Sequence, residues 1–216
     1  MSTITQPRLG LAAHPVAGIL RVAFGLLTLA AITGSLIHSA SQGPVNPFNF
    51  FGYFTIQNNL LMGVVLIAVA IRSLSGRAPS LGWSLARGFA VSYMAVVGIV
   101  YNTLLVGVDG GASLPWSNFV MHVLFPIIAV LDWIIFTDRV ALPWRTFWWV
   151  LVYPAVWTIV VLIRGATDGW VPYPFLNPAN GYGVVALYCL GVVVAFLVSA
   201  AVVYWIARIR PGRAPR

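Results

Sequence analysis

Residues 52–61, GYFTIQNNLL, place four polar side chains at the head of a segment that stays apolar as far as Ile71. Three of them, Thr55, Asn58 and Asn59, stand at positions i, i+3 and i+4, so a helix carries them on one face. Hydroxyl and amide groups are costly in hydrocarbon unless they form hydrogen bonds, so this face is expected to point into protein or a water-filled cavity. The segment therefore predicts a membrane-spanning helix with a polar, inward-facing patch near its start.

The whole chain has the composition of a membrane protein. Of its 216 residues, 60% are hydrophobic and 7% are charged, and five long runs contain no charge: 22–71, 88–108, 110–131, 146–163 and 169–207. A helix needs about 20 apolar residues to cross the hydrocarbon of a bilayer. The runs predict an all-α polytopic membrane protein, a bundle of six transmembrane helices in one domain covering residues 1–216. The expected helices are approximately 16–38, 50–71, 84–106, 116–136, 146–163 and 182–208.

The basic residues indicate how the bundle is oriented. All twelve are arginines, and six spans leave only Arg164 on the side opposite the termini, with the other eleven on the terminal side. Because arginine-rich ends are retained in the cytoplasm, we expect both termini to be cytoplasmic. The net charge of +8 is then explained by membrane orientation, and no nucleic-acid partner is expected.

The segment between the fifth and sixth spans contains residues 170–175, WVPYPF. Tryptophan and tyrosine favour the membrane–water interface, and prolines prevent the segment from continuing as a helix. We expect this aromatic loop to lie along the outer interface, where it either caps the bundle or serves as an interfacial anchor with no further role.

Six spans bring distant polar residues to one depth. The second and fourth spans enter from the side opposite the termini, which places Thr55 about 7 Å and His122 about 9 Å below the boundary. We expect a single polar layer on this side, formed by Thr55, Asn58, Asn59, Tyr101, Asn102 and His122. Pro126 lacks the N–H that would bond the His122 carbonyl, so it is expected to kink the fourth span and to open a pocket beside the imidazole.

Asp132 belongs to a different layer, because it follows His122 by ten residues, or about 15 Å along a helix. An unpaired carboxylate is costly at this depth, so we predict a structural ion pair on the terminal side. The candidate partners are Arg72, Arg87 and Arg139. The acids available to orient His122 are Asp109 and Asp168.

Two short patterns resemble a known family. Tyr53-Phe54-Thr55, and His122 followed by Leu124 and Pro126, look like the pattern of the androgen-induced and androgen-dependent TFPI-regulating membrane proteins. Those are multi-pass threonine hydrolases that cleave fatty acid esters of hydroxy fatty acids with a Thr nucleophile and a His. Most of the chain also resembles bacterial six-helix membrane proteins of the proline-rich type, which implies a bacterial inner (plasma) membrane. The features there are Phe-Thr with downstream Asn, Asp132-Trp133 and residues 173–178, YPFLNP.

The resemblance implies a lipid-ester hydrolase, although Gln57-Asn58-Asn59 depart from the hydrolase pattern. Thr55 would attack the acyl carbon after giving its proton to neutral His122, because a threonine hydroxyl is a weak nucleophile that requires a base. Substrate-binding candidates, including amides that would hold the oxyanion, are Asn58, Asn59, Tyr101 and Asn102. The expected partners are membrane lipids and a hydrophobic acyl substrate, with no metal and no cofactor. The oligomeric state is left open.

Other interpretations use the same residues. Thr55 and the asparagines can bond the preceding helical turn or a neighbouring helix, and His122 can serve packing alone. A non-enzymatic transporter or binding protein for lipids or small solutes would place the same polar layer around its ligand. His38 and His122, at similar depth, also suit a haem or metal protein. The single cysteine, Cys189, excludes an internal disulfide and a multi-cysteine metal site.

Overall fold

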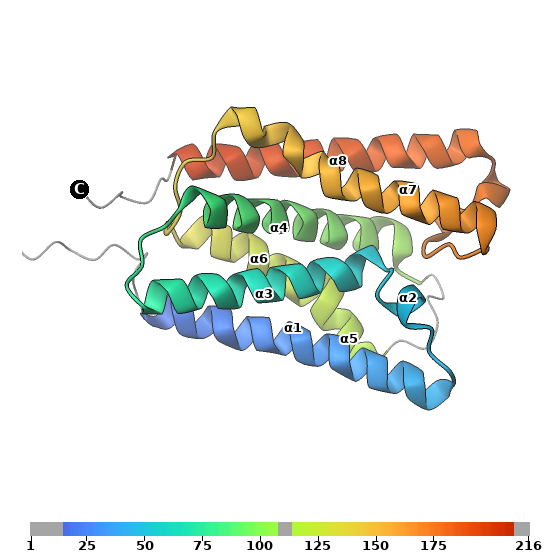
Figure 1. Ribbon diagram of the computed structural model, residues 1–216, viewed down its shortest axis with the longest axis horizontal. Helices are drawn as coiled ribbons and strands as arrows, with labels where there is room; N and C mark the ends of the chain where they lie inside the picture. The colour runs from blue at the N-terminus through green and yellow to red at the C-terminus, as the bar shows by residue number, and fades with distance from the viewer. Residues whose placement is uncertain (1–14, 108–113, 210–216) are drawn as a thin grey trace, which may run out of the picture.

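The computed structural model describes residues 15–107 and 114–209, and that part of the chain contains helices but no strand. Six helical units in it are long and apolar enough to cross a membrane. The protein is therefore a multi-pass, all-α membrane protein, as the sequence predicts. The beginning of the first helix and the end of the last lie at the same end of the bundle, here called the terminal end (Figure 1).

The spans are built from α-helices with short irregular turns. The elements in chain order are α1 (Pro15–Gln42), α2 (Pro47–Phe50), α3 (Phe54–Leu74), α4 (Leu81–Val100), η2 (Tyr101–Leu105), α5 (Pro115–Phe119), η3 (Val120–Leu124), α6 (Phe125–Ile135), η4 (Trp144–Leu151), α7 (Val152–Thr167), η5 (Pro174–Leu176), η6 (Pro178–Asn180) and α8 (Tyr182–Ile209). The turns η2 and η3 are π-helical, whereas η4 is a 3-10 segment that leads into α7.

The expected start of the second span at residue 50 is wrong. Residues 47–50 form the separate helix α2, which is capped by Asn46, whose side chain accepts hydrogen bonds from two backbone N–H groups. Between α2 and α3, a Cβ on Gly52 would lie 2.5 Å from the Trp170 ring, so glycine lets the aromatic loop approach the backbone here. Thr55 consequently lies in the first turn of α3 rather than about five residues into a helix. The first span also runs on past residue 38, to Gln42, because the chain meets no helix-breaking residue before Gly43.

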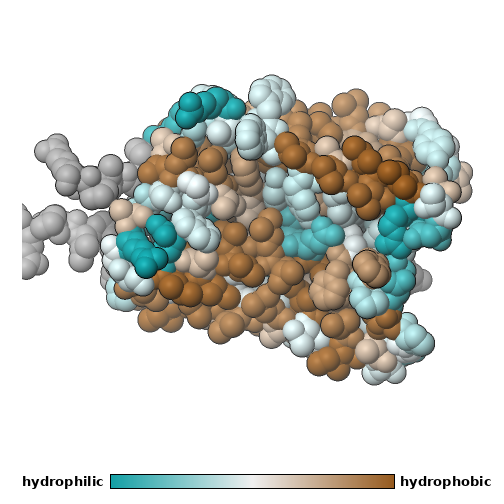
Figure 2. Space-filling model, in the orientation of Figure 1, coloured by the Kyte–Doolittle hydropathy of each residue, from teal (hydrophilic) through white to brown (hydrophobic). Residues whose placement is uncertain are grey.

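Helix α4 is the central helix of the bundle. It packs against α3, α6 and α8, while α1 packs against α3 (Figure 1). A Cβ on Gly25 of α1 would lie 3.0 Å from the carbonyl oxygen of Gly63 of α3, so glycine permits this close approach. Small residues of this kind support helix association in a membrane, where hydrophobic burial supplies little driving force between helices. Apolar side chains cover most of the bundle face shown in Figure 2, apart from a hydrophilic patch near its middle.

Four charged side chains form a buried cluster near the terminal end. Asp132 of α6 pairs with Nε of Arg21 of α1 and with Nη2 of Arg87 of α4, each at 2.6 Å. Asp138, which follows α6, contacts Nη2 of Arg21 at 2.7 Å and Nη1 of Arg87 at 2.8 Å. Burial acts to raise the pKa of Asp138, but the two guanidinium groups outweigh it and hold that pKa below its ordinary value. Two positive and two negative charges therefore balance while they join α1, α4 and α6.

The predicted pairing of Asp132 with Arg87 is confirmed, and Arg21 is an additional partner that was not expected. Arg139 instead donates to the carbonyl of Trp133 at 2.6 Å, and its guanidinium lies 4.4 Å from the centre of the Trp133 ring. Arg72 donates to the carbonyl of Ala78, not to Asp132. Three of the arginines that were counted as markers of the terminal side are thus buried in the bundle.

The cytoplasmic location of the terminal end stays a prediction, which rests on the arginine bias. We expect green fluorescent protein fused after residue 216 to fluoresce, and alkaline phosphatase fused at the same position to be inactive, because the first requires the cytoplasm and the second requires export. An active phosphatase with a dark fluorescent fusion would reverse the orientation.

Candidate functional site

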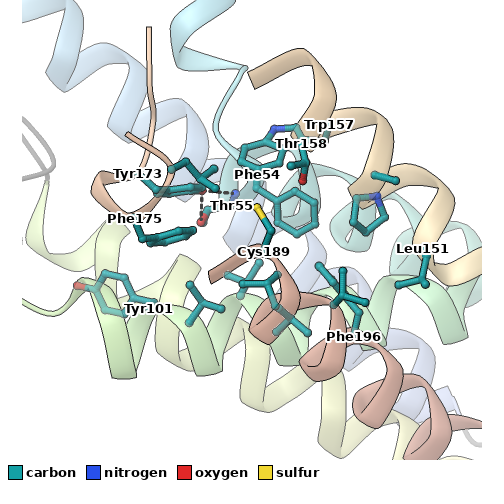
Figure 3. Close-up of a pocket in the computed structure, with 18 of the residues that line it drawn as sticks. Phe54, Thr55, Tyr101, Leu151, Trp157, Thr158, Tyr173, Phe175, Cys189 and Phe196 are labelled. Atoms are coloured by element: carbon teal, nitrogen blue, oxygen red, sulfur yellow. Dashed lines mark hydrogen bonds between the residues drawn. The ribbon is translucent and has the colours of Figure 1, made fainter. Parts of the chain in front are cut away.

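A cavity of about 330 Å³ lies between α4, α7 and α8. Figure 3 shows Tyr101, Thr55 and Tyr173 toward one side of it, and Leu151 and Phe196 toward the other. The remaining walls are almost wholly apolar and include Val96, Val97, Val100, Pro154, Ile159, Val192 and Val193. The cavity thus has a polar end and an apolar end.

The shape of the cavity follows from the way α7 and α8 are joined at their two ends. Near the terminal end, η4 packs on α8, and Oγ1 of Thr146 lies 2.8 Å from Oη of Tyr204. Pro154 comes directly after the change from the 3-10 turn to α7, where its missing N–H disturbs a regular helix. At the other end a buried cluster connects α7, the residue that follows the aromatic loop, and α8; it is formed by Val161, Leu176 and Val185. Between these two contacts the helices leave room for a ligand.

The aromatic loop covers the cavity at the end away from the termini. The rings of Tyr173 and Phe175 stack with centroids 5.4 Å apart, and both line the cavity. Gly169 and Gly181 have φ values of +73° and +83°, which glycine adopts without strain and which allow the chain to turn at both ends of the loop. The loop therefore caps this part of the bundle, whereas its position at the membrane interface stays a prediction. Tyr173 is in addition a site residue, although the sequence indicated only an interfacial role for it.

Thr55 and Tyr173 form a pair of hydroxyl groups in the cavity wall. Oγ1 of Thr55 lies 3.4 Å from Oη of Tyr173, and the backbone N–H of Thr55 donates to the same phenol oxygen at 3.3 Å. Burial raises the pKa of Tyr173 to about 12, so the phenol is neutral at ordinary pH and can donate a hydrogen bond. The pair can therefore bind the polar end of an otherwise apolar ligand.

His122 lies behind Tyr101, which lines the cavity. The imidazole stacks on the Tyr101 ring, with centroids 4.0 Å apart and an interplanar angle of 21°. Nδ1 of His122 is 3.0 Å from the carbonyl oxygen of Asn118. A carbonyl only accepts, so this contact assigns the proton of the neutral ring to Nδ1 and leaves the lone pair on Nε2. Within the described residues Nε2 has no hydrogen-bond partner, which is the state that a general base requires.

The structure brings the helices of Thr55 and His122 together, but not the two side chains. Nδ2 of Asn59 donates to the carbonyl of Thr55 at 2.9 Å and to that of Met121 at 3.1 Å, so α3 and η3 are neighbours. In residues 15–107 and 114–209, the Thr55 hydroxyl bonds Tyr173 and the imidazole bonds Asn118, with no hydrogen bond between the predicted partners. A working Thr55–His122 pair stays a prediction.

The side chains of Asn58 and Asn59 donate hydrogen bonds to backbone carbonyls of α3 and η3. Oδ1 of Asn59 accepts from the Thr28 hydroxyl at 2.9 Å, and both of its amide hydrogens have carbonyl partners. Nδ2 of Asn58 donates to the carbonyl of Phe54, one turn earlier, at 2.7 Å. Asn59 therefore has no hydrogen left for an oxyanion, and Tyr173 is better placed for that role.

Asn102 and Pro126 lie on neighbouring spans next to His122. Nδ2 of Asn102 donates to the carbonyl of Gly98 at 2.8 Å and contacts that of His122 at 3.4 Å. In a regular α-helix the N–H of residue 126 would donate to the His122 carbonyl, but Pro126 has no N–H. Pro126 was expected to open a pocket beside the imidazole. Instead, Pro126 packs against Gly98, where an added Cβ would lie 3.0 Å from Cβ of Pro126.

Two acids were expected to orient His122. Asp168 pairs with Arg164, and Asp109 is outside the described residues. In the part of the chain that the structure describes, no group of three His, Cys, Asp or Glu side chains is arranged to hold a metal ion. Comparison with models of known protein families, with curated proteins and with solved structures finds no match.

Proposed function

We propose that the protein binds the acyl chain of a membrane lipid in this cavity, with the polar end of the ligand at Thr55 and Tyr173. The observation that carries the proposal is an apolar cavity of about 330 Å³ whose wall presents this hydroxyl pair toward one side. An acyl ester matches that distribution, because its carbonyl accepts hydrogen bonds and its chain needs none. A charged, water-soluble solute would leave its polar groups unpaired against valine and phenylalanine walls.

Cys189 provides a direct test, because it lines the cavity and is the only cysteine. We expect a monoacylglycerol with a twelve-carbon chain to protect this thiol from a maleimide in purified protein in lipid nanodiscs. At about ten times the dissociation constant, the unoccupied fraction and therefore the labelling rate should fall roughly tenfold. Mass spectrometry of the intact protein measures the rate.

The matched control moves the thiol by one residue. In the double variant Cys189→Ala, Leu190→Cys, the thiol replaces a side chain that is 61% exposed on the lipid-facing surface of α8. Its labelling should not change when the monoacylglycerol is added. Equal labelling rates of Cys189 with and without the ligand would contradict acyl binding in the cavity.

Hydrolysis of the bound ester is the second candidate function, in line with the resemblance to threonine hydrolases. The observations that favour it are the Thr55 hydroxyl in the cavity wall and a His122 Nε2 that has no partner among the described residues, next to Tyr101 of the same cavity. In this reaction, Nε2 takes the Thr55 proton as Oγ1 bonds to the acyl carbon. The Tyr173 hydroxyl donates to the carbonyl oxygen as it becomes negative.

The reaction then completes in two steps. The bond from the acyl carbon to the alcohol oxygen breaks, and that oxygen takes the proton from His122. Water next attacks the acyl-threonine, gives one proton to His122, and releases the fatty acid and free Thr55 as the proton returns to Oγ1. The lipid nature of the substrate suits a protein of the bacterial inner membrane, which is the location that we propose.

A further inference from the structure

A second hollow, of about 650 Å³, lies beside the first, and the Trp157 side chain lines both. Its walls come from α2 and the residues that follow it, from Gln57, and from the last turns of α7 with Asp168 and Trp170. Figure 2 shows hydrophilic side chains gathered at this end of the molecule, over α2 and the end of α7. The hollow lies at an end of the spans, where lipid head groups are expected to meet the protein.

Arg164 is the positively charged residue that lines this hollow. It is also the one arginine that the six-span topology places on the side opposite the termini. Nη2 donates to Oδ1 of Asn49 at 2.7 Å, and Nε donates to Oδ2 of Asp168 at 2.8 Å. The guanidinium carbon lies 4.2 Å from the centre of the Trp170 ring. Within the described residues Nη1 has no hydrogen-bond partner, so a fixed cation keeps one donor group available.

Asp168 places a negative charge beside it. Its side chain is 48% exposed, and Oδ1 accepts from the N–H of Trp170 at 2.9 Å. The hydrogen bonds from this backbone N–H and from Arg164 lower the pKa of Asp168, so the group is ionised at neutral pH. Oδ2 already faces both Nε and Nη2 of Arg164, so Oδ1 is the oxygen that can accept a further hydrogen bond. The hollow thus presents a positive and a negative group side by side.

We propose that this hollow binds the head group of a zwitterionic phospholipid that carries a primary ammonium, with the phosphate on Arg164 and the ammonium on Asp168. Such a head group is complementary to both charges at once. An anionic head group is attracted by Arg164 but repelled by Asp168. A quaternary ammonium has no N–H to donate to the carboxylate, and the Trp170 face that would attract it is already covered by Arg164. Binding of this head group does not require a ligand in the apolar cavity.

The test uses the full chain in nanodiscs that contain equal amounts of phosphatidylethanolamine, phosphatidylcholine and phosphatidylglycerol. The lipids that stay bound after transfer to detergent are counted by native mass spectrometry. We expect phosphatidylethanolamine to exceed each of the other two by at least about threefold, since only it forms both charge-assisted contacts. Equal retention of the three lipids by the wild type would overturn the proposal.

Two charge-removing variants separate this site from general lipid contact. Asp168→Asn removes the negative charge from an exposed position and should shift the preference to phosphatidylglycerol, because Arg164 is then not neutralised. Arg164→Gln should abolish the preference for phosphatidylethanolamine. Arg77→Gln, at an exposed position near the terminal end, is the control and should change nothing. If Arg164→Gln does not fold, Asp168→Asn decides alone: an unchanged preference for phosphatidylethanolamine in that variant refutes the proposal.

Discussion

Thr55→Ala is expected to abolish hydrolysis of a long-chain acyl ester by the purified protein in nanodiscs. If Thr55 is the nucleophile, no other group completes the acyl transfer, and the rate should fall at least about 100-fold. His122→Ala should have a similar effect, because general-base assistance contributes roughly 10²–10⁴-fold. Release of the fatty acid, measured by mass spectrometry, gives the rate, and thermal unfolding in detergent checks that each variant is folded.

Matched variants make the result specific to the proposed chemistry. Thr158 is a second threonine in the cavity lining, and Thr158→Ala should retain nearly all activity. Thr55→Ser should retain part of it, since the hydroxyl stays in place. The double variant Thr55→Ala, His122→Ala should be no slower than either single variant, because residues that act as one unit lose function together. Undiminished hydrolysis by folded Thr55→Ala would refute the threonine mechanism and leave acyl binding as the function.

The six spans could be predicted from the sequence because hydrocarbon imposes strong constraints on length and charge. Every span had to fall within a run of about 20 apolar residues, and loops had to contain the glycines and prolines. The error at the start of α3 has a specific cause. Hydropathy does not distinguish a short interfacial helix from the first turn of a span, and Gly52 marks the boundary only through its contact with Trp170, far along the chain.

The candidate site could be predicted in part for a similar reason. The depth of a residue along its helix follows from topology alone. Depth correctly predicted that Asn59 lies at the level of Met121 and Asn102 at the level of His122, and each amide contacts the backbone carbonyl of that residue. The rotation of each helix and the position of a loop do not follow from topology. The sequence therefore gave no indication that Tyr173 bonds Thr55, or that Tyr101 lies between the cavity and His122.

Asp132→Leu is expected to destabilise the protein by about 3–5 kcal/mol, because Arg21 and Arg87 would lose a buried partner. Both arginine side chains are 1% exposed, so water cannot compensate for the lost carboxylate. Thermal or denaturant unfolding in detergent, followed by tryptophan fluorescence, measures the change. Asp168→Asn is the control for loss of a carboxylate. Because Asp168 and its partner Arg164 are both partly solvated, this variant should be far less destabilised than Asp132→Leu.

Removing Arg21 together with Asp132 is expected to restore much of the stability that is lost in Asp132→Leu. The double variant Arg21→Met, Asp132→Leu leaves Arg87 and Asp138, which are 2.8 Å apart, as a balanced pair. It should be more stable than Asp132→Leu alone by at least about 1 kcal/mol, because replacing a buried ion pair with apolar groups costs less than leaving one charge unpaired. A double variant less stable than the single one would show that Arg21 stabilises the bundle through Asp138 rather than through charge balance. In either case the folded fraction should keep acyl-dependent protection of Cys189, because the charge cluster and the cavity share no residue.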